Sequence, residues 1–165
     1  MLASPETVSS TPLHGPRMTV GHDLVYLPDL RLQLADPAST FLRGTFTAAE
    51  LRTAELRARS RRPENSPAQA LDLAPHLGAR YAAKEAFLKA WDLRHWGAVP
   101  PMNPASVDLR EIEVVTDAWG RPKLAIHGEV AARLRSVEPP LSLSLTLSHD
   151  GPFASAVVLM HEVTP

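Results

Sequence analysis

Five polar residues have types and positions that could perform chemistry on a phosphate group. Asp23 lies in a run that alternates like a β-strand, and Glu85 and Lys89 stand one turn apart on a predicted helix. Ser148 and His149 end another predicted strand. Proteins usually hold Mg²⁺ with one or two carboxylates, while waters and phosphate oxygens complete the octahedron. Asp23 and Glu85 together therefore predict a phosphate-bearing substrate, and Lys89 could meet charge that develops on it.

Two of these features also have ordinary structural explanations. Aspartate is depleted in strands and a buried carboxylate needs a partner, but Asp23 could instead end a strand and reach water. Glu85 and Lys89 have the i, i+4 spacing of pairs that are common on exposed helices. From the helix alone, a functional site and an exposed surface pair are equally good explanations of Glu85 and Lys89. The strand itself shows one face with Met18, Val20, Leu24 and Tyr26 and another with Gly21, Asp23, Val25 and Leu27.

Several other kinds of site are not indicated by the sequence. It contains no close pair of His or Cys ligands for zinc and no Gly-x-Ser-x-Gly of a serine hydrolase. The glycine patterns of Walker and Rossmann nucleotide sites are also absent. Because the chain has no cysteine, disulfides and thiolate chemistry are excluded, which fits a cytoplasmic protein.

The helix that carries Glu85 and Lys89 is predicted over residues 80–93. Ala, Leu, Lys and Glu dominate it, and no Gly, Pro or β-branched residue interrupts it. At helical period, Glu85, Lys89 and Asp92 form a narrow polar strip between two wide apolar arcs. A charged strip between two buried faces suggests a lined site. One arc comprises Tyr81, Phe87, Leu88 and Trp91, and the other comprises Ala82, Ala83, Ala86 and Ala90.

Length and composition place the chain among single-domain globular proteins. Its 165 residues are enough for a core, and a formal net charge of −1 gives no general attraction to nucleic acid or to an anionic membrane. No apolar run approaches the roughly 20 residues of a membrane span, and we see no secretion signal. We expect residues 1–16, rich in Ser, Thr and Pro, to be a disordered extension of one domain over residues 17–165.

The order of the remaining patterns predicts an α+β fold, with helices packed on an antiparallel-rich sheet. A capping box at Thr47 to Glu50 starts a helix to about Ser60, whose arginine-rich end is either a solvated face or a docking patch for an acidic partner. Asp36-Pro37 is expected to start a short helix. The other expected elements are a strand over 18–27, a polar loop over 62–67, a hairpin with strands at 112–115 and 122–126, a helix over 129–134, and a strand pair over 141–147 and 153–160.

Taken in order, the motifs resemble those of a known enzyme family. They are Gly21-His22-Asp23-Leu24-Val25, Phe46-Thr47-Ala48-Ala49-Glu50-Leu51, the run from Arg80 to Ala90, Gly120-Arg121-Pro122, and Leu147-Ser148-His149-Asp150. The series is similar to that of 4′-phosphopantetheinyl transferases of the holo-acyl-carrier-protein synthase type. The similarity covers about residues 20–160, apart from loops near 62–74 and 94–106. Two positions depart from the family pattern, because His22 replaces an aliphatic residue and Asp29 stands where a basic residue commonly follows.

The resemblance implies a Mg²⁺-dependent transfer of 4′-phosphopantetheine from coenzyme A to a serine of an acyl carrier protein, with release of adenosine 3′,5′-bisphosphate. Asp23 and Glu85 would hold the metal against the diphosphate. Glu85 would help to deprotonate the serine, and Lys89 would stabilise the transferring phosphate. The same resemblance implies coenzyme contacts from Arg80, Lys84, Gly120, Arg121, Pro122, Ser148 and His149.

The resemblance also implies a homotrimer with its site at a subunit interface, and an acidic carrier protein as the partner. A non-catalytic homologue that binds coenzyme A or a carrier would share this fold, but it would not need a serine-activating group such as Glu85. A purely structural protein would leave Asp23 without a role. The motifs do not specify whether the carrier serves fatty acid, polyketide or nonribosomal peptide synthesis.

Overall fold

The described residues fall into three stretches of the chain. This computed structural model describes residues 18–60, 71–137 and 139–163, so the predictions for residues 1–16 and for the loop at 62–67 fall outside the described residues. The strands are β1 (Met18–Tyr26), β2 (Ile112–Thr116), β3 (Pro122–Ile126), β4 (Leu141–Asp150) and β5 (Phe153–Glu162). The helices are α1 (Leu27–Ala35), α2 (Phe41–Thr45), α3 (Ala48–Ser60), α4 (Ala74–Arg94) and α5 (Gly128–Arg135), with 3₁₀ turns at Pro104–Ser106 and Leu109–Glu111.

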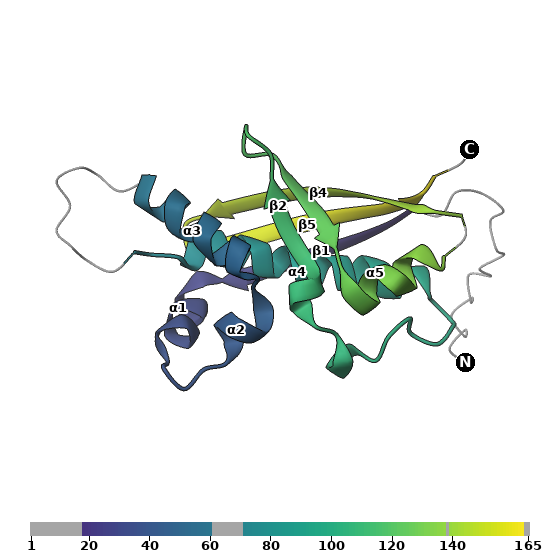
Figure 1. Ribbon diagram of the computed structural model, residues 1–165, viewed down its shortest axis with the longest axis horizontal. Helices are drawn as coiled ribbons and strands as arrows, with labels where there is room; N and C mark the ends of the chain where they lie inside the picture. The colour runs from purple at the N-terminus through teal and green to yellow at the C-terminus, as the bar shows by residue number, and fades with distance from the viewer. Residues whose placement is uncertain (1–17, 61–70, 138, 164–165) are drawn as a thin grey trace, which may run out of the picture.

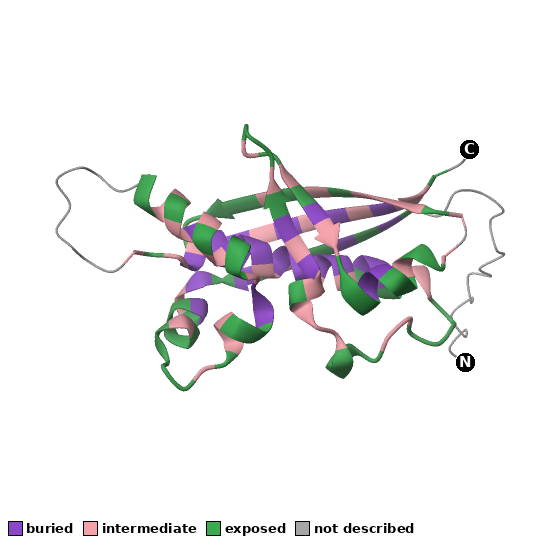
Figure 2. Cartoon of the chain, in the orientation of Figure 1, coloured by how far each residue is buried: buried purple, intermediate pink, exposed green. Residues whose placement is uncertain are grey.

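The strands form two antiparallel sheets, so the predicted α+β class is confirmed. β1, β5 and β4 make a three-stranded sheet in that order, while β2 and β3 form a separate hairpin. Helix α4 crosses one face of the three-stranded sheet and also contacts α3 and β2 (Figure 1). The buried positions accordingly gather along α4 and the strands that it crosses (Figure 2). Helix α4 is thus the central element of the fold.

The alanine arc of α4 packs directly on the sheet. All four of its alanines are fully buried. A Cβ atom at Gly21 of β1 would collide with the carbonyl oxygen of Ala86, so the glycine allows the two backbones to approach closely. The opposite arc is buried at Phe87 and Trp91 and partly buried at Tyr81 and Leu88. Both wide faces are therefore covered, as the sequence predicts.

The fold differs from our prediction near the start of the chain. β1 ends at Tyr26, and the following residues form α1, a helix that was not predicted, with Pro28 in its first turn. The prediction of a helix that starts at Asp36-Pro37 is wrong. The Asp36 carboxylate accepts a hydrogen bond from the N–H of Ala38 (2.9 Å), which stabilises a local turn, and α2 begins only at Phe41.

The other predicted elements are confirmed with small changes at their ends. The capping box forms, since the Thr47 hydroxyl accepts from the N–H of Glu50 (3.1 Å) and the Glu50 carboxylate accepts from the N–H of Thr47 (2.9 Å). Helix α4 begins before its predicted start, because Pro75 is accommodated in its first turn. The hairpin, α5 and the final strand pair occur where expected. None of the helices in the described ranges is both long and apolar enough to cross a membrane.

The apolar face predicted for β1 exists, but it points outward. Met18, Val20, Leu24 and Tyr26 are 65%, 51%, 56% and 47% exposed, whereas the face that carries Asp23 packs on α4. Phe153 of β5 pairs with Tyr26 and extends this surface, with ring centroids 5.5 Å apart. We call this surface the outer β1 face. His22 is also exposed on this face, between Val20 and Leu24. Exposed apolar surface of this kind usually marks an interaction site.

Candidate active site

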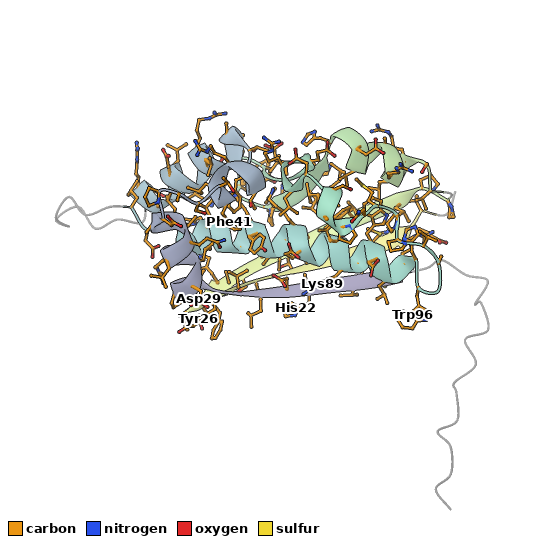
Figure 3. All side chains as sticks on the ribbon, turned by 90° about the horizontal axis from the view of Figure 1, so that it is seen from below. His22, Tyr26, Asp29, Phe41, Lys89 and Trp96 are labelled. Atoms are coloured by element: carbon orange, nitrogen blue, oxygen red, sulfur yellow. The ribbon has the colours of Figure 1, made fainter. Side chains whose placement is uncertain are left out.

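Asp23 and Lys89 meet between β1 and α4. The Nζ atom of Lys89 lies 2.8 Å from Oδ1 of Asp23 and 3.2 Å from the main-chain oxygen of His22. Figure 3 shows Lys89 on α4 beside the strand that carries His22. The ammonium group thus pairs with a carboxylate 66 positions away in the chain. This contact favours a site built from two elements and argues against a merely local ion pair on the helix surface.

Glu85 adds a second carboxylate to this cluster. It shares with Asp23 a groove of about 340 Å³ that α1 and β1 also line. Burial raises the pKa of Glu85 and the charge of Asp23 raises it further, although Lys89 and the Tyr81 hydroxyl offset part of this rise. Two carboxylates that disfavour each other's charge are stabilised when a cation binds between them. The cluster therefore has the electrostatics of a cation site.

The two carboxylates fit Mg²⁺ better than a metal that requires a full set of protein ligands. Within the described ranges, no group of three or more His, Cys, Asp or Glu side chains could hold a metal ion. Mg²⁺ commonly takes one or two carboxylates and completes its octahedron with waters and substrate phosphates. Asp23 and Glu85 supply that number, so a metal at this site would depend on phosphate oxygens from the substrate.

Tyr81 is a site residue that our sequence analysis placed only in the core. Its pKa is raised by burial and by the charges of Glu85 and Asp23, and its hydroxyl in turn lowers the pKa of Glu85. Its ring packs edge to face on Phe41, with centroids 5.1 Å apart and an interplanar angle of 83°. The i, i+4 spacing of Tyr81 and Glu85 was the signal that could have revealed this contact. Tyr81 thus supports the orientation of Glu85 from a packed position.

A second group of predicted residues gathers around Arg80. The Arg80 side chain is buried and donates a hydrogen bond to the carbonyl oxygen of His76 (2.9 Å). Burial lowers the pKa of Arg80, the charge of Glu50 opposes this shift, and the charge of Arg57 adds to it. The His76 ring meets the His149 ring edge to face, with centroids 5.9 Å apart. These cationic and imidazole groups suit phosphate oxygens.

The turn between β2 and β3 lies close to Arg57 of α3. A Cβ atom at Gly120 would come within 2.9 Å of the Arg57 guanidinium, and the positive φ of Gly120 favours glycine there. The Arg121 guanidinium pairs with Asp117 (2.6 Å) and stacks over Trp119 at 5.0 Å. Sequence patterns alone do not link Arg57 to this turn, because the two are distant in the chain. Of the other predicted contacts, Pro122 begins β3 and Ser148 is exposed near the end of β4.

The two groups point to different sides of α4. Arg80 and Glu85 are five positions apart, which places their side chains roughly 140° apart around a helix. Arg80 is influenced by charges on α3, whereas Glu85 is influenced by Asp23 of β1. The tip of the β2–β3 hairpin, which carries Gly120, also stands away from α4 (Figure 1). One chain therefore does not direct all the predicted site residues toward a single point.

Lys84 belongs to neither group in the arrangement that the structure shows. Its ammonium group is fully buried, and it donates to the Glu50 carboxylate (2.9 Å) and to the carbonyl oxygens of Leu109 (3.0 Å) and Ile112 (2.7 Å). An ammonium group has three N–H donors, and these partners use all of them. The observed contacts hold α4 to α3 and to the start of β2. The coenzyme contact expected of Lys84 remains a prediction.

Several known proteins are similar to this chain over most of its length. The model of the 4′-phosphopantetheinyl transferase superfamily matches residues 19–146. A holo-[acyl-carrier-protein] synthase of Corynebacterium glutamicum is 38% identical over 143 residues, which cover 87% of this chain and 97% of that protein. The solved Chronobacterium ammoniagenes ACPS–CoA complex is 40% identical, with a TM-score of 0.76 and coverage of 90% of this chain and 99% of the other. For the Mycobacterium tuberculosis acyl carrier protein synthase structure, the identity is 33%, the TM-score 0.63, and the coverage 88% and 97%.

Proposed function

Because the chain belongs to the 4′-phosphopantetheinyl transferase superfamily, as an enzyme of the holo-[acyl-carrier-protein] synthase type, we propose that it transfers 4′-phosphopantetheine from coenzyme A to a carrier serine. The serine oxygen forms a bond to the phosphorus that bears pantetheine. The diphosphate bond breaks, the serine proton passes to a base, and adenosine 3′,5′-bisphosphate leaves. The observation that carries the proposal is the Asp23–Lys89–Glu85 cluster.

Each residue of the cluster has a separate task in this reaction. Asp23 and Glu85 would hold Mg²⁺, which neutralises the diphosphate and orients it when bound. Glu85 would also accept the serine proton, directly or through a water, because its carboxylate lines the open groove beside Asp23. Lys89 is 54% exposed at its side chain, so its ammonium group can leave Asp23 and contact the transferring phosphate.

The experiment that tests the function is the mass of an apo carrier protein after incubation with this protein, coenzyme A and Mg²⁺. We expect the mass to rise by one phosphopantetheine group, and we expect EDTA to prevent the rise because the two carboxylates cannot hold the diphosphate alone. A panel of carriers from fatty acid, polyketide and nonribosomal peptide synthesis would identify the partner. If no carrier gains mass, a non-catalytic binding homologue becomes the better explanation.

The coenzyme is proposed to bind between two copies of the chain. The Asp23–Glu85 cluster and the group around Arg80 point to different sides of α4, so a partner subunit would bring the second group to the first. The outer β1 face offers the apolar surface for such an assembly, and pairing there would cover an exposed sheet. Together with the family resemblance, these features support a homotrimer. The sequence without cysteine fits the proposed location in the reducing cytoplasm.

Mixing two inactive variants should restore activity if the site is shared between subunits. Asp23→Asn removes one half of the proposed site, and Arg121→Ala combined with His149→Ala removes the other. Subunits exchanged between these variants would form some interfaces with both halves intact. Transfer should be measured at a coenzyme A concentration well below the wild-type KM, beside the oligomer mass of each sample. Activity no higher than the sum of the two separate variants would contradict a shared site.

A further inference from the structure

The short helix α2 has no role in the reaction described so far, but one of its side chains lies close to Glu85. Phe41 stands on α2 beside the N-terminal half of α4 (Figure 3). Its ring meets the Tyr81 ring edge to face, with centroids 5.1 Å apart. Tyr81 precedes Glu85 by one helical turn, and both side chains line the groove that Asp23 shares. A single side chain therefore separates Phe41 from Glu85.

Phe41 is itself held in place by a buried ring. The Phe46 ring meets it edge to face, with centroids 5.7 Å apart and an interplanar angle of 81°. Phe46 is 2% exposed and belongs to a second hydrophobic cluster, which it forms with residues of α3 and α4. The N–H of Phe41 also donates to the Ser39 hydroxyl (3.2 Å). Edge-to-face contact is a favoured arrangement of aromatic rings, so Phe46, Phe41 and Tyr81 form a continuous packed series. We call these three residues the aromatic brace.

Glu85 needs a fixed neighbour because its side chain is long and flexible. A glutamate loses rotamer freedom when its carboxylate is ordered, and a contact must offset that cost. The Lys89 ammonium group already lies 2.8 Å from Asp23, and Glu85 takes part in no ion pair among the described residues. The Tyr81 hydroxyl is close enough to lower the pKa of Glu85. Tyr81 is therefore the neighbour that can fix this carboxylate.

We propose that Phe41 is a positioning residue, which acts through Tyr81 to hold the Glu85 carboxylate toward Asp23; this inference rests on the proposed function. Groups that orient a metal ligand without touching the metal matter for its affinity, and changing one costs roughly 10- to 100-fold in metal affinity or activity. The Phe41 ring has no atom that could take a proton or hold a diphosphate. Its effect on the reaction must therefore pass through the orientation of Tyr81.

Removing the Phe41 ring should slow the reaction without weakening the carrier. We expect Phe41→Leu to lower kcat roughly tenfold with an unchanged KM for the carrier. Mn²⁺ binding in the presence of coenzyme A and without a carrier, followed by electron paramagnetic resonance, should weaken by a similar factor. Tyr81→Phe keeps the ring packing but removes the hydroxyl, and we expect the same two losses. Phe41→Tyr keeps the ring and should retain most of the wild-type kcat.

The double variant Phe41→Leu with Tyr81→Phe shows whether the two residues act along one route. If Phe41 acts through the Tyr81 hydroxyl, the second substitution adds little, so the total loss of kcat should stay roughly tenfold. A loss equal to the product of the two single losses overturns the inference. Unchanged kcat and Mn²⁺ affinity in folded Phe41→Leu also overturn it. If Phe41→Leu does not fold, the same unchanged values in Tyr81→Phe overturn it.

The matched control is Phe87→Leu, a change of the same size on α4 itself. Phe87 is fully buried, but its ring packs on Trp91 in the main core, with centroids 5.6 Å apart. This variant should unfold at a lower temperature than the wild type and yet keep its kcat and Mn²⁺ affinity well below that temperature. An equal fall in Phe87→Leu would indicate general loosening of α4 and would overturn the role of Phe41. Failure of the proposed function is distinct, because the wild-type protein would then modify no carrier.

Discussion

We expect Asp23→Asn to lower the rate of phosphopantetheine transfer by about a thousandfold, which corresponds to about 4 kcal/mol of transition-state stabilisation. The substitution keeps the shape of the side chain but removes the charge that faces Glu85 and pairs with Lys89 at 2.8 Å. One neutral amide and one carboxylate would hold a divalent cation poorly against the diphosphate. The loss should therefore appear in kcat and in the Mg²⁺ concentration needed for half-maximal activity.

Asp29→Asn is the matched control for this variant. Asp29 lines the same groove as Asp23 and Glu85, but it lies on α1 and is exposed. If general negative charge around the groove attracts the metal, both substitutions should weaken metal dependence. If Asp23 is a ligand, only Asp23→Asn should do so, and both variants should unfold at nearly the wild-type temperature. Full activity of Asp23→Asn would refute the metal assignment.

The sequence pointed to the three members of the Asp23–Lys89–Glu85 cluster because its signals are local. Glu85 and Lys89 occupy a polar strip between two apolar arcs, and Asp23 interrupts an alternating strand. Projection of the sequence at the helical or strand period shows directly where a polar residue interrupts an apolar pattern. The contact between Lys89 and Asp23 joins residues 66 positions apart, so no period could establish it. The motif order supplied that connection through the family resemblance.

The sequence could not show which face of β1 is buried in one chain. Alternation separates Val20 and Leu24 from Gly21 and Asp23, but the apolar set is the exposed one. Glycine at position 21 faces α4 because only a residue without a Cβ fits against Ala86. The hydrophobic pattern of a strand shows that a face is suited to burial. It does not distinguish a face that packs on the core from a face that packs on another subunit. The exposed apolar face is thus consistent with a site completed by another copy.

The prediction failed at α1 because a weak helical signal there was followed by a stronger one at Asp36-Pro37. Leu27, Leu30 and Leu34 have helical spacing, and the first two are buried while Leu34 packs against the core. Pro28 is compatible with a first helical turn. The stronger signal in the sequence was Asp36-Pro37, which can start either a helix or a turn. The structure uses the Asp36 carboxylate for a turn, and tertiary packing of the leucines decides where the helix lies.

Lys84 illustrates how adjacent motif residues acquire different roles. The family resemblance implied a coenzyme contact for Lys84, which precedes Glu85 in the sequence. Neighbours on a helix point about 100° apart, so Lys84 turns toward Glu50 of α3 while Glu85 turns toward Asp23. Burial lowers the pKa of Lys84, and the charge of Glu50 opposes this shift. We therefore expect this buried ion pair to affect the free energy of unfolding.

Lys84→Met should destabilise the protein by about 3–5 kcal/mol, because it removes one partner of a fully buried ion pair. The Glu50 carboxylate would keep its hydrogen bonds from the N–H groups of Thr47 (2.9 Å) and Val114 (3.0 Å) but would lose its counter-charge. The carbonyl oxygens of Leu109 and Ile112 would also lose a donor. Urea unfolding of both proteins at the same concentration measures the change, and the oligomer mass measured beside it shows whether association has altered as well.

The double variant Lys84→Met with Glu50→Gln separates the lost charge pair from lost packing. Glutamine is neutral and can still accept from a main-chain N–H, so the double variant should recover part of the stability that Lys84→Met loses. Arg133→Ala breaks an exposed ion pair with Glu129 on α5 and should cost little. If Lys84→Met were as stable as Arg133→Ala, the buried pair would not hold α4 against α3. If the double variant were less stable than Lys84→Met, the hydrogen bonds of Glu50 would outweigh its uncompensated charge.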